Sequence, residues 1–338
     1  MNEKINEIIA LQEQPDEVQY SFHPKTFDDY LGQAALKEKL AVYTQAAKMR
    51  NEPLDHMLLF GPPGLGKTTL AHIMAHVMGV NIKLCSGPML ERTGDLVAIL
   101  SSLEQRDILF IDEIHRMPTN VEEVLYSAME HFRVDVIIGQ GAGAKSVSLP
   151  VHPFTLVGAT TKSGMISAPL RSRFGINERL DFYTFEDLRD IILQNAIYLN
   201  LTISAESAYL IAQCSRGTPR IAKKIIRRIR DFAQVHHDNV ADHSVVQKAL
   251  DFLGLDDQGL TKIDILLLQK MVENFNGGPV GLETIASLIG EDADTIETVY
   301  EPYLLRLGYL EKTPRGRQIP PKKLAQLIQR FLGQQSIP

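Results

Sequence analysis

The stretch His56-Met57-Leu58-Leu59-Phe60-Gly61-Pro62-Pro63-Gly64-Leu65-Gly66-Lys67-Thr68-Thr69 decides the fold. It begins with a short apolar run typical of a buried strand, and apolar residues then recur at helical spacing from Lys67 to Met78. A strand, a glycine loop and a helix in this order form one unit of a parallel α/β sheet. Apolar runs at Ile108–Ile111 and Phe154–Val157 predict two more strands of this sheet.

The glycine loop matches the phosphate-binding pattern G-x-x-x-x-G-K-[ST] from Gly61 to Thr68. Glycines let successive backbone N–H groups turn inward and cradle phosphate oxygens at a helix N-terminus, which already favours anions. In such a loop Lys67 holds the β- and γ-phosphates of ATP, and the Thr68 hydroxyl binds Mg²⁺. The nucleotide contacts expected here are Gly64, Gly66, Lys67, Thr68 and Thr69.

The predicted strand Ile108–Ile111 runs into two carboxylates, Asp112 and Glu113. A strand of this kind, lying beside the P-loop strand, delivers Asp112 to the magnesium shell and Glu113 to a water in line with the γ-phosphate. A nucleotide kinase needs the first carboxylate but not the second, so Glu113 favours hydrolysis over phosphoryl transfer to a substrate. The alternative is that the acidic pair caps the next helix.

The composition fits a folded protein of two or three domains. The chain has 338 residues, of which 44% are hydrophobic and 22% charged, unlike chains that stay disordered. No apolar run approaches the roughly 18 residues of a membrane span, and the first residues lack a signal-peptide pattern, so a cytoplasmic location is expected. Cys85 and Cys214 are too few for a disulfide framework or a structural zinc site, and both are expected to be reduced.

The charge is unevenly distributed along the chain. The net charge of −6 argues against nucleic acid binding by the whole surface. However, the segment from Arg216 to Arg230 holds seven basic residues and no acidic one, and the segment from Glu301 to Pro338 holds seven basic and two acidic residues. Contact with a polyanion is therefore expected in particular regions of the chain.

Beyond Tyr183 the apolar stripes recur only at helical spacing, which predicts a small helical domain. The turn-forming stretch Gly254–Gly259 follows, and then three helical segments lead to a short hairpin around Thr313-Pro314-Arg315-Gly316, an order typical of a winged helix. The predicted fold is an α/β P-loop domain with a helical lid and a C-terminal winged helix. The predicted limits are 1–20 for an N-terminal helical segment, 21–182 for the P-loop domain, 183–254 for the helical lid and 255–338 for the winged helix.

Two alternating segments around the glycine-rich stretch 139–143 predict a β-hairpin inserted at 133–150. Val136, Ile137 and Ile138 put apolar groups on both faces of this ribbon, so one face lacks an evident partner inside the chain. The ribbon is therefore expected to dock another protein, unless it folds flat on its own domain.

The motifs, taken in order, resemble those of the AAA+ ATPases. They are the P-loop, the Asp-Glu strand, Gly158-Ala159-Thr160-Thr161, Leu170-Arg171-Ser172-Arg173-Phe174-Gly175 and Gly217-Thr218-Pro219-Arg220. Together with Asp112-Glu113-Ile114-His115-Arg116 and Thr313-Pro314-Arg315-Gly316-Arg317, they resemble the RuvB family of Holliday-junction motors. The similarity runs from about Phe22 to Arg317.

This resemblance implies roles for further residues. Thr161 would be the sensor-1 group that helps position the lytic water, and Arg220 the sensor-2 group that links nucleotide state to domain angle. Arg173 would be the arginine finger that reaches a neighbour's γ-phosphate, with Arg171 as the competing candidate. The alternative for these arginines is surface salt bridging. The adenine pocket would include Phe22, His23, Tyr183 and Pro219, where His23 replaces the arginine usual in the family.

The resemblance also implies partners and a setting. The family works as a hexameric ring on DNA in recombination, repair and the SOS response, together with the junction-binding protein RuvA and a RuvC-like resolvase. RuvA would dock on the inserted hairpin. Wing residues Lys312, Arg315 and Arg317 would contact phosphates without reading sequence. Two alternatives remain, a clamp-loader-type ATPase and a nucleotide-gated switch with little turnover.

Overall fold

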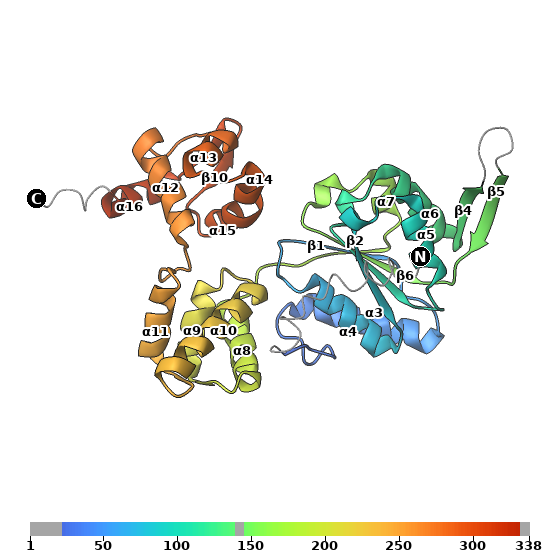
Figure 1. The fold of residues 1–338 in the computed structure, drawn as a ribbon, viewed down its shortest axis with the longest axis horizontal. Helices are drawn as coiled ribbons and strands as arrows, with labels where there is room; N and C mark the ends of the chain where they lie inside the picture. Colours follow the sequence, from blue (N-terminus) through green and yellow to red (C-terminus); the bar gives the residue numbers. More distant parts are fainter. Residues whose placement is uncertain (1–21, 139–144, 332–338) are drawn as a thin grey trace, which may run out of the picture. The chain divides into compact units, whose positions relative to one another are not determined.

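The computed structural model describes residues 22–138 and 145–331. The N-terminal helical segment predicted at 1–20 and the glycine-rich tip of the predicted hairpin lie outside these residues. The chain forms two compact units (Figure 1). The first contains the described residues up to Leu201 together with Gly217–Ile226, and the second contains Thr202–Arg216 together with the described residues from Arg227 onward.

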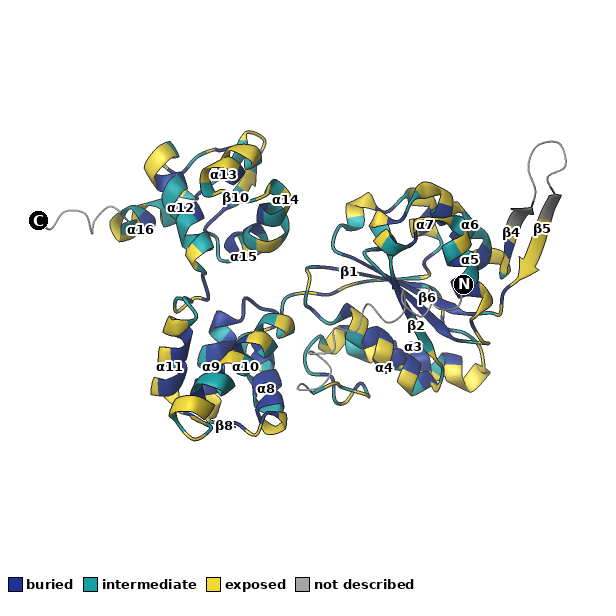
Figure 2. Cartoon of the chain, viewed as in Figure 1, coloured by how far each residue is buried: buried dark blue, intermediate teal, exposed yellow. Residues whose placement is uncertain are grey.

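A five-stranded parallel sheet forms the centre of the first unit. Its order is β2-β3-β6-β1-β7, with β1 at Met57–Phe60, β2 at Ile82–Ser86, β3 at Ile108–Asp112, β6 at Thr155–Thr160 and β7 at Ile176–Arg179. The three predicted strands are confirmed as β1, β3 and β6, and β6 is buried along its whole length (Figure 2). The expectation that the Asp-Glu strand lies beside the P-loop strand is wrong, because β6 pairs with both and separates them.

The second unit contains the rest of the lid helices and the winged helix. After β8 (Thr202–Ile203), α9 (Ala205–Cys214), β9 (Val240–Ala241) and α11 (His243–Phe252), the chain continues into α12 (Lys262–Phe275), α13 (Leu282–Ile289), α14 (Ala293–Thr295), a π-helical turn η5 (Ile296–Tyr300), α15 (Glu301–Arg306) and α16 (Pro321–Phe331). The predicted wing is confirmed as the antiparallel pair β10 (Glu311–Thr313) and β11 (Gly316–Gln318). The helix α10 (Pro219–His236) contributes to both units.

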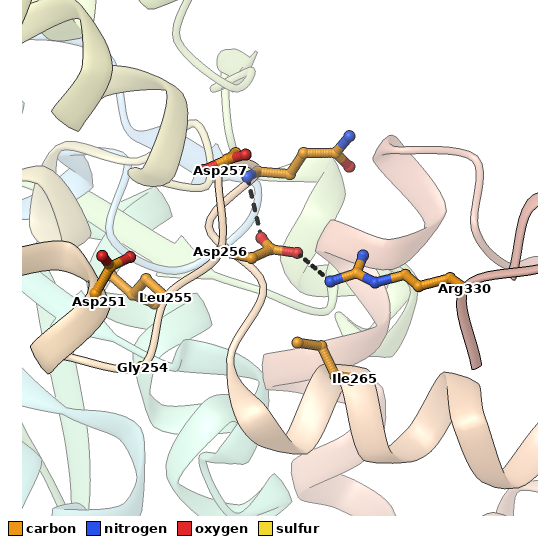
Figure 3. A pocket seen from close by; sticks show the side chains of 8 residues that line it. Asp251, Gly254, Leu255, Asp256, Asp257, Ile265 and Arg330 are labelled. Atoms are coloured by element: carbon orange, nitrogen blue, oxygen red, sulfur yellow. Dashed lines mark hydrogen bonds and ion pairs between the residues drawn. The ribbon is translucent and has the colours of Figure 1, made fainter. Parts of the chain in front are cut away.

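The turn residues predicted at Gly254–Gly259 connect α11 to α12 inside the second unit. Asp256 organises this connection: its carboxylate accepts hydrogen bonds from the backbone N–H of Gln258 at 3.0 Å and of Leu260 at 2.8 Å. The same carboxylate binds the guanidinium of Arg330 at 3.1 Å, next to an open pocket (Figure 3). The connection is therefore an ordered turn with contacts to α16.

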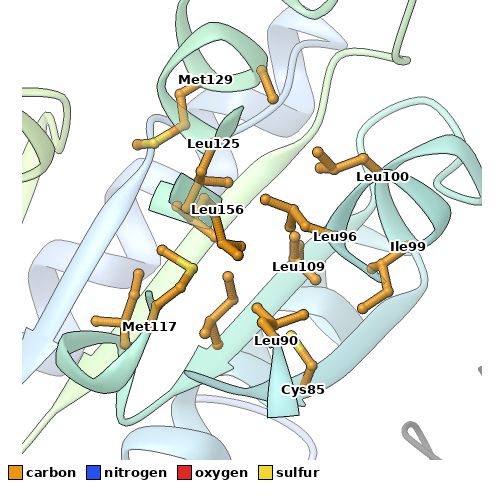
Figure 4. Close-up of a cluster of buried hydrophobic side chains, with 14 of the residues drawn as sticks. Cys85, Leu90, Leu96, Ile99, Leu100, Leu109, Met117, Leu125, Met129 and Leu156 are labelled. Carbon is orange, nitrogen blue, oxygen red and sulfur yellow. The ribbon is translucent and has the colours of Figure 1, made fainter. Parts of the chain in front are cut away.

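Helices cover both faces of the sheet. Figure 1 shows α3 (Ala34–Arg50) and α4 (Lys67–Met78) on one face, and α5 (Thr93–Ser101), α6 (Thr119–His131) and α7 (Ala168–Ser172) on the other. Between the sheet and the second group lies a core that includes Leu96, Leu109, Leu125 and Leu156 (Figure 4). Each fully buried leucine contributes roughly 1.5–3 kcal/mol relative to an exposed one, so this core fixes the strand ends that carry the site.

The predicted insertion is confirmed as an antiparallel hairpin, β4 (Arg133–Ile138) and β5 (Lys145–Pro150). The remaining helix of the first unit, α8 (Phe185–Tyr198), follows β7. No helix within 22–138 and 145–331 has the length and apolarity needed to cross a membrane. Cys85 and Cys214 are free thiols in the two cores, as predicted, and burial raises the pKa of each to about 12.

Candidate functional site

The phosphate loop lies between β1 and α4, as the sequence predicts. Gly64 and Gly66 have positive φ angles of 79° and 98°. A Cβ at Gly64 would lie 2.9 Å from Cβ of Arg220, and one at Gly66 would lie 2.8 Å from the hydroxyl oxygen of Tyr30. Only glycine fits these two positions, so the loop keeps a concave backbone surface of the kind that holds phosphates.

Lys67 begins α4 and is buried inside the loop. Its ammonium donates hydrogen bonds to the carbonyl oxygens of Gly61 at 2.8 Å and Pro62 at 3.0 Å. Burial lowers the pKa of Lys67, whereas the nearby carboxylates of Asp112 and Glu113 raise it. The loop lysine and the two predicted acids thus belong to one electrostatic site. Thr68 is exposed and Thr69 partly exposed on the first turn of α4, where the Thr68 hydroxyl fits the expected magnesium contact.

Two buried tyrosines form hydrogen bonds with the backbone of the phosphate loop. The hydroxyls of Tyr30 and Tyr183 both donate to the carbonyl oxygen of Leu65, at 3.3 and 3.2 Å, and lie 2.7 Å from each other. Burial raises the pKa of Tyr30 to about 12 and also raises that of Tyr183. Tyr183 was expected at the adenine, and its hydroxyl contacts the loop backbone. Tyr30 was not predicted, because a single tyrosine before a helix carries no pattern.

Asp112 and Glu113 lie at the end of β3, as predicted. Asp112 accepts a hydrogen bond from the backbone N–H of Glu113 at 2.9 Å. Glu113 has a φ of 47°, the left-handed region that residues with a Cβ rarely occupy. A close approach holds this turn, since a Cβ on Gly87 would lie 2.4 Å from the carbonyl oxygen of Glu113.

The carboxylate of Glu113 is held by groups at the end of β6 and on the turn η2 (Ile114–Arg116). The Thr161 hydroxyl donates to Glu113 Oε2 at 3.2 Å, and His115 Nδ1 lies 3.3 Å from the same oxygen and 2.9 Å from the Thr160 hydroxyl. A carboxylate only accepts hydrogen bonds, so Nδ1 of His115 carries a proton when it bonds to Glu113. Burial lowers the pKa of His115. The predicted Thr161 therefore forms a hydrogen bond with Glu113. His115 contacts the same carboxylate and was not predicted from the sequence.

The segment that contains Arg220 packs on the phosphate loop. The backbone N–H of Arg220 lies 3.4 Å from the carbonyl oxygen of Gly64, and the Arg220 charge is among those that lower the pKa of Lys67. Pro219 begins α10 directly before it. The predicted sensor-2 arginine therefore lies at the nucleotide loop of its own chain.

Phe22, which was expected at the adenine, contacts both α8 and α10. Phe22 donates its backbone N–H to the Asn195 side chain at 3.2 Å, accepts a hydrogen bond from Lys223 at 2.8 Å, and stacks on Tyr198 with ring centroids 5.1 Å apart. His23, next to it, is exposed. Phe22 is therefore held by contacts with both helices.

Arg173, the predicted finger, lies at the end of α7 and contacts α6. Its guanidinium lies 4.4 Å from the ring centroid of Tyr126, 3.1 Å from the Glu130 carboxylate and 2.7 Å from the carbonyl oxygen of Pro169. Arg171 is exposed and bonds to the carbonyl oxygen of Ser163. Arg173 is therefore held by an aromatic ring and an acid, whereas Arg171 is held only by backbone in the contacts of the described residues.

The predicted DNA-contacting cations of the wing differ in their surroundings. Lys312 and Arg317 both bind the buried carboxylate of Glu301, at 2.7 and 2.6 Å, and both lie 3.5 Å from Glu297. Arg315 is exposed at the turn between β10 and β11. The sequence placed all three on the wing correctly, but two of them form ion pairs with acids of η5 and α15.

On the inserted hairpin, Val136, Ile137 and Ile138 lie on β4 opposite Val147, Ser146 and Lys145. The side chains of the three predicted docking residues lie outside what the structure describes. Val147 and Leu149 of β5 are more than one-third exposed, and their two-residue spacing puts them on one face. The hairpin therefore exposes apolar side chains on β5, whereas the sequence had predicted them only on β4.

Family models match the chain almost from end to end. The "Holliday junction DNA helicase RuvB P-loop domain" matches residues 22–180, the "RuvB AAA lid domain" matches 183–256, and the "RuvB C-terminal winged helix domain" matches 257–328. The three regions follow the same order as the P-loop, lid and winged-helix regions described above.

Close relatives carry one name. A protein from Ligilactobacillus salivarius named Holliday junction branch migration complex subunit RuvB is 55% identical over 299 residues, which cover 88% of this chain and 89% of that protein. A protein of the same name from Leuconostoc mesenteroides is 54% identical, with 92% and 88% covered. The solved structure of the Thermotoga maritima RuvB Holliday junction branch migration motor is 48% identical, has a TM-score of 0.81, and covers 90% of this chain and 97% of its own.

Proposed function

The chain belongs to the RuvB family, and from this membership we propose that it is an ATP-driven motor that moves Holliday junctions during recombination and DNA repair. The observation that carries this proposal is the joint electrostatic site of Lys67, Asp112 and Glu113 in a chain that matches the family from its P-loop to its wing. A clamp-loader-type ATPase and a switch with little turnover are not favoured, because the relatives are named as branch-migration proteins.

Hydrolysis of ATP would use the two strand ends described above. The backbone of Gly64 and Gly66 and the ammonium of Lys67 bind the phosphates. Glu113 accepts a proton from the attacking water, and Thr161 and His115 orient the Glu113 carboxylate toward that water. Adenine would lie between Tyr183, Pro219 and the segment that contains Phe22 and His23. Thr68 and Asp112 would bind Mg²⁺, which neutralises charge on the transferring phosphate.

The working form would be a closed ring of identical subunits, a hexamer by family resemblance. In such a ring Arg173 of one subunit approaches the γ-phosphate held by the next. The contacts of Arg173 support this role, because the aromatic ring of Tyr126 and the carboxylate of Glu130 hold its guanidinium at a defined position. Arg220 would read the nucleotide held by its own subunit.

DNA contact would be made at the wing, through phosphates and therefore without sequence preference. Arg315 is exposed at the wing turn and would contribute most. Lys312 and Arg317 would contribute less, because Glu301 and Glu297 neutralise part of their charge. We place the protein in the bacterial cytoplasm, where it would work with RuvA and a RuvC-like resolvase as part of the SOS response.

The inserted hairpin would dock RuvA. Replacing Ile137 and Ile138 by serine, or Val147 and Leu149 by serine, should abolish stimulation by RuvA and leave basal ATP hydrolysis unchanged, because the hairpin lies outside the nucleotide site. Ser148→Ala, which changes the opposite face of β5, is the matched control. Stimulation and basal hydrolysis should be measured side by side, and an equal loss of both would contradict the docking role.

The central test is ATP-dependent dissociation of a synthetic four-way junction, with and without RuvA. The wild-type chain should dissociate the junction, and Glu113→Gln should bind ATP but lose dissociation and nearly all hydrolysis. Unchanged ATP turnover in Glu113→Gln would contradict the assignment of Glu113. Turnover without dissociation in the wild type would contradict the motor.

A further inference from the structure

Arg216 occupies an unusual position at the end of α9. Its φ of 52° and that of Gly217, 73°, place two consecutive residues in the left-handed region. This region is unfavourable for arginine because of its Cβ, so other contacts must hold the turn. Arg216 is also buried, which is uncommon for a charged residue.

The side chain of Arg216 reaches from the lid to the winged helix. Its guanidinium donates to Asp264 Oδ1 on α12 at 2.9 Å, in an ion pair whose two side chains are 8% and 0% exposed. The guanidinium carbon also lies 4.7 Å from the ring centroid of Tyr303 on α15. One arginine therefore contacts two helices of the winged-helix region.

Asp264 has a separate use for each of its oxygens. Oδ2 accepts hydrogen bonds from the backbone N–H and the hydroxyl of Thr261, at 2.8 and 2.7 Å, which caps the start of α12. Oδ1 accepts from Arg216. Without Arg216 a fully buried carboxylate would lose its cation, which is strongly unfavourable.

The connection around this pair is closely packed. A Cβ on Gly259 would lie 2.4 Å from the carbonyl oxygen of Cys214, and the Cys214 sulfur lies 3.5 Å from the carbonyl oxygen of Asp256. The Tyr303 hydroxyl donates to the carbonyl oxygen of Gln258. The end of α9, the turn at 256–259 and α15 thus form one packed joint around Arg216.

Along the chain, only three residues separate Arg216 from Arg220, which contacts the phosphate loop. Arg216 is followed by Gly217, Thr218 and Pro219, and then by Arg220, whose backbone N–H lies 3.4 Å from the carbonyl oxygen of Gly64. The short segment 216–220 therefore has a buried anchor in the winged-helix region at one end and a contact with the phosphate loop at the other.

We propose that Arg216 is a positioning residue that couples ATP hydrolysis to DNA movement, by holding the winged-helix region to the end of α9 through Asp264. When the segment 218–220 shifts during the ATP cycle, the winged-helix region, which contacts DNA, then moves with it. The proposal rests on the motor function proposed above. A loosened joint leaves ATP hydrolysis intact and reduces the movement of DNA per ATP.

The test compares Arg216→Met, Asp264→Asn and the double variant with the wild type, in the presence of RuvA. Lys270→Met removes an exposed ion pair with Glu273 on the same helix α12 and is the matched control. Two quantities are measured: the rate of ATP hydrolysis, and the number of junctions dissociated per ATP. Hydrogen exchange at residues 255–262 reports independently on the joint.

We expect both single variants to hydrolyse ATP within about twofold of the wild-type rate, with at least a tenfold loss of junctions dissociated per ATP. The double variant should lose no more than the worse single variant, because both changes break the same pair. Hydrogen exchange at 255–262 should become faster, and Lys270→Met should behave as wild type.

An unchanged number of junctions per ATP in Arg216→Met, or the same loss in Lys270→Met, would overturn the coupling role. If Arg216→Met does not fold, Arg216→Lys keeps the charge but loses the planar fork and the stacking on Tyr303, and an unchanged ratio there overturns the role as well. A wild-type chain that dissociates no junctions contradicts the motor function itself, which is a separate outcome.

Discussion

At the scale of single residues, Glu113 shows how the backbone directs the chemistry. Glu113 has a left-handed φ of 47°, and its carboxylate contacts two side chains, whereas Asp112 accepts a hydrogen bond from a backbone N–H. Both acids raise the pKa of Lys67, and Glu113 also contacts Thr161 and His115. A carboxylate with two defined neighbours has its lone pairs in a fixed direction, as a general base requires.

The first prediction concerns His115. Its removal in His115→Ala leaves Glu113 held by Thr161 alone, and a misplacement of about 1 Å reduces the rate about 100-fold. The turnover number for ATP should fall by about 10- to 100-fold, while the dissociation constant for ATP stays within about twofold. In His115→Asn, the side-chain amide can replace Nδ1–H and should restore most of the rate. An equal loss in the alanine and asparagine variants would contradict the role.

The second prediction separates two arginines of the wing. Arg315→Ala should weaken DNA binding at every sequence and reduce the slope of log K against log salt by about 0.9, the value for one phosphate contact. Arg317→Ala removes one of two cations from the buried Glu301 and should instead lower the free energy of unfolding by about 2 kcal/mol, less than a complete break because Lys312 remains. Salt titrations and urea unfolding of both variants check this, and a common effect of the two would count against it.

At the scale of elements, sequence patterns predicted the strands with continuous apolar runs. They missed β2 and β7, whose sequences Ile82-Lys83-Leu84-Cys85-Ser86 and Ile176-Asn177-Glu178-Arg179 mix polar and apolar residues because they lie at the two edges of the sheet. Strand order was also missed. Each parallel strand is joined to the next through a crossover, and no local pattern records which strands become neighbours.

The residues of the candidate site that belong to sequence motifs could be predicted from the sequence. Lys67, Asp112, Glu113 and Thr161 follow strands at fixed places in recognisable runs, and the structure joins them. Tyr30 and Arg216 were not predictable, since each acts through contacts with residues far away in the sequence. Their roles depend on tertiary packing, which a local pattern does not contain.

The third prediction concerns His56, directly before β1. His56 Nδ1 accepts a hydrogen bond from the backbone N–H of Leu156 on β6 at 2.9 Å, and Nε2 lies 3.1 Å from the carbonyl oxygen of Met129 on α6. These contacts need the neutral ring, and burial lowers the pKa of His56 below its usual 6.5. The unfolded state binds the proton more readily, so this stability is fully present above about pH 6.5 and is lost as the pH falls through the folded pKa.

The measurement is the free energy of unfolding in urea from pH 8 to pH 5, for the wild type and for His56→Gln. Glutamine offers an acceptor and a donor but does not titrate. The advantage of the wild type should therefore shrink as the solution becomes acidic. The lowered pKa of His115 acts in the same direction, but it is common to both proteins and cancels in the difference. A difference that stays constant over this range would refute the assignment.

At the scale of the whole molecule, the proposed ring makes each nucleotide site depend on two subunits. Within one subunit, Arg173 contacts Tyr126 and Glu130. Lys67 would therefore act on the nucleotide of its own subunit and Arg173 on that of the neighbouring subunit. A subunit that lacks Lys67 can then still supply Arg173 to a neighbour that has lost Arg173 but keeps Lys67.

The fourth prediction uses this property. Lys67→Ala and Arg173→Ala should each be nearly inactive alone, and an equal mixture should recover about a quarter of the wild-type hydrolysis rate, because random assembly pairs an intact lysine with an intact arginine at that frequency. Mixing Arg173→Ala with wild type should reduce junction dissociation more steeply than in proportion. Arg171→Ala should stay active alone, and if it is inactive and complements Lys67→Ala, Arg171 is the finger.

The burial of the two thiols has a consequence for their reactivity. Oxidants attack the thiolate, and burial raises the pKa of both Cys85 and Cys214 to about 12, which disfavours that form. Both sulfurs are also shielded from water. Treatment of the folded protein with peroxide should therefore leave both cysteines in the thiol form.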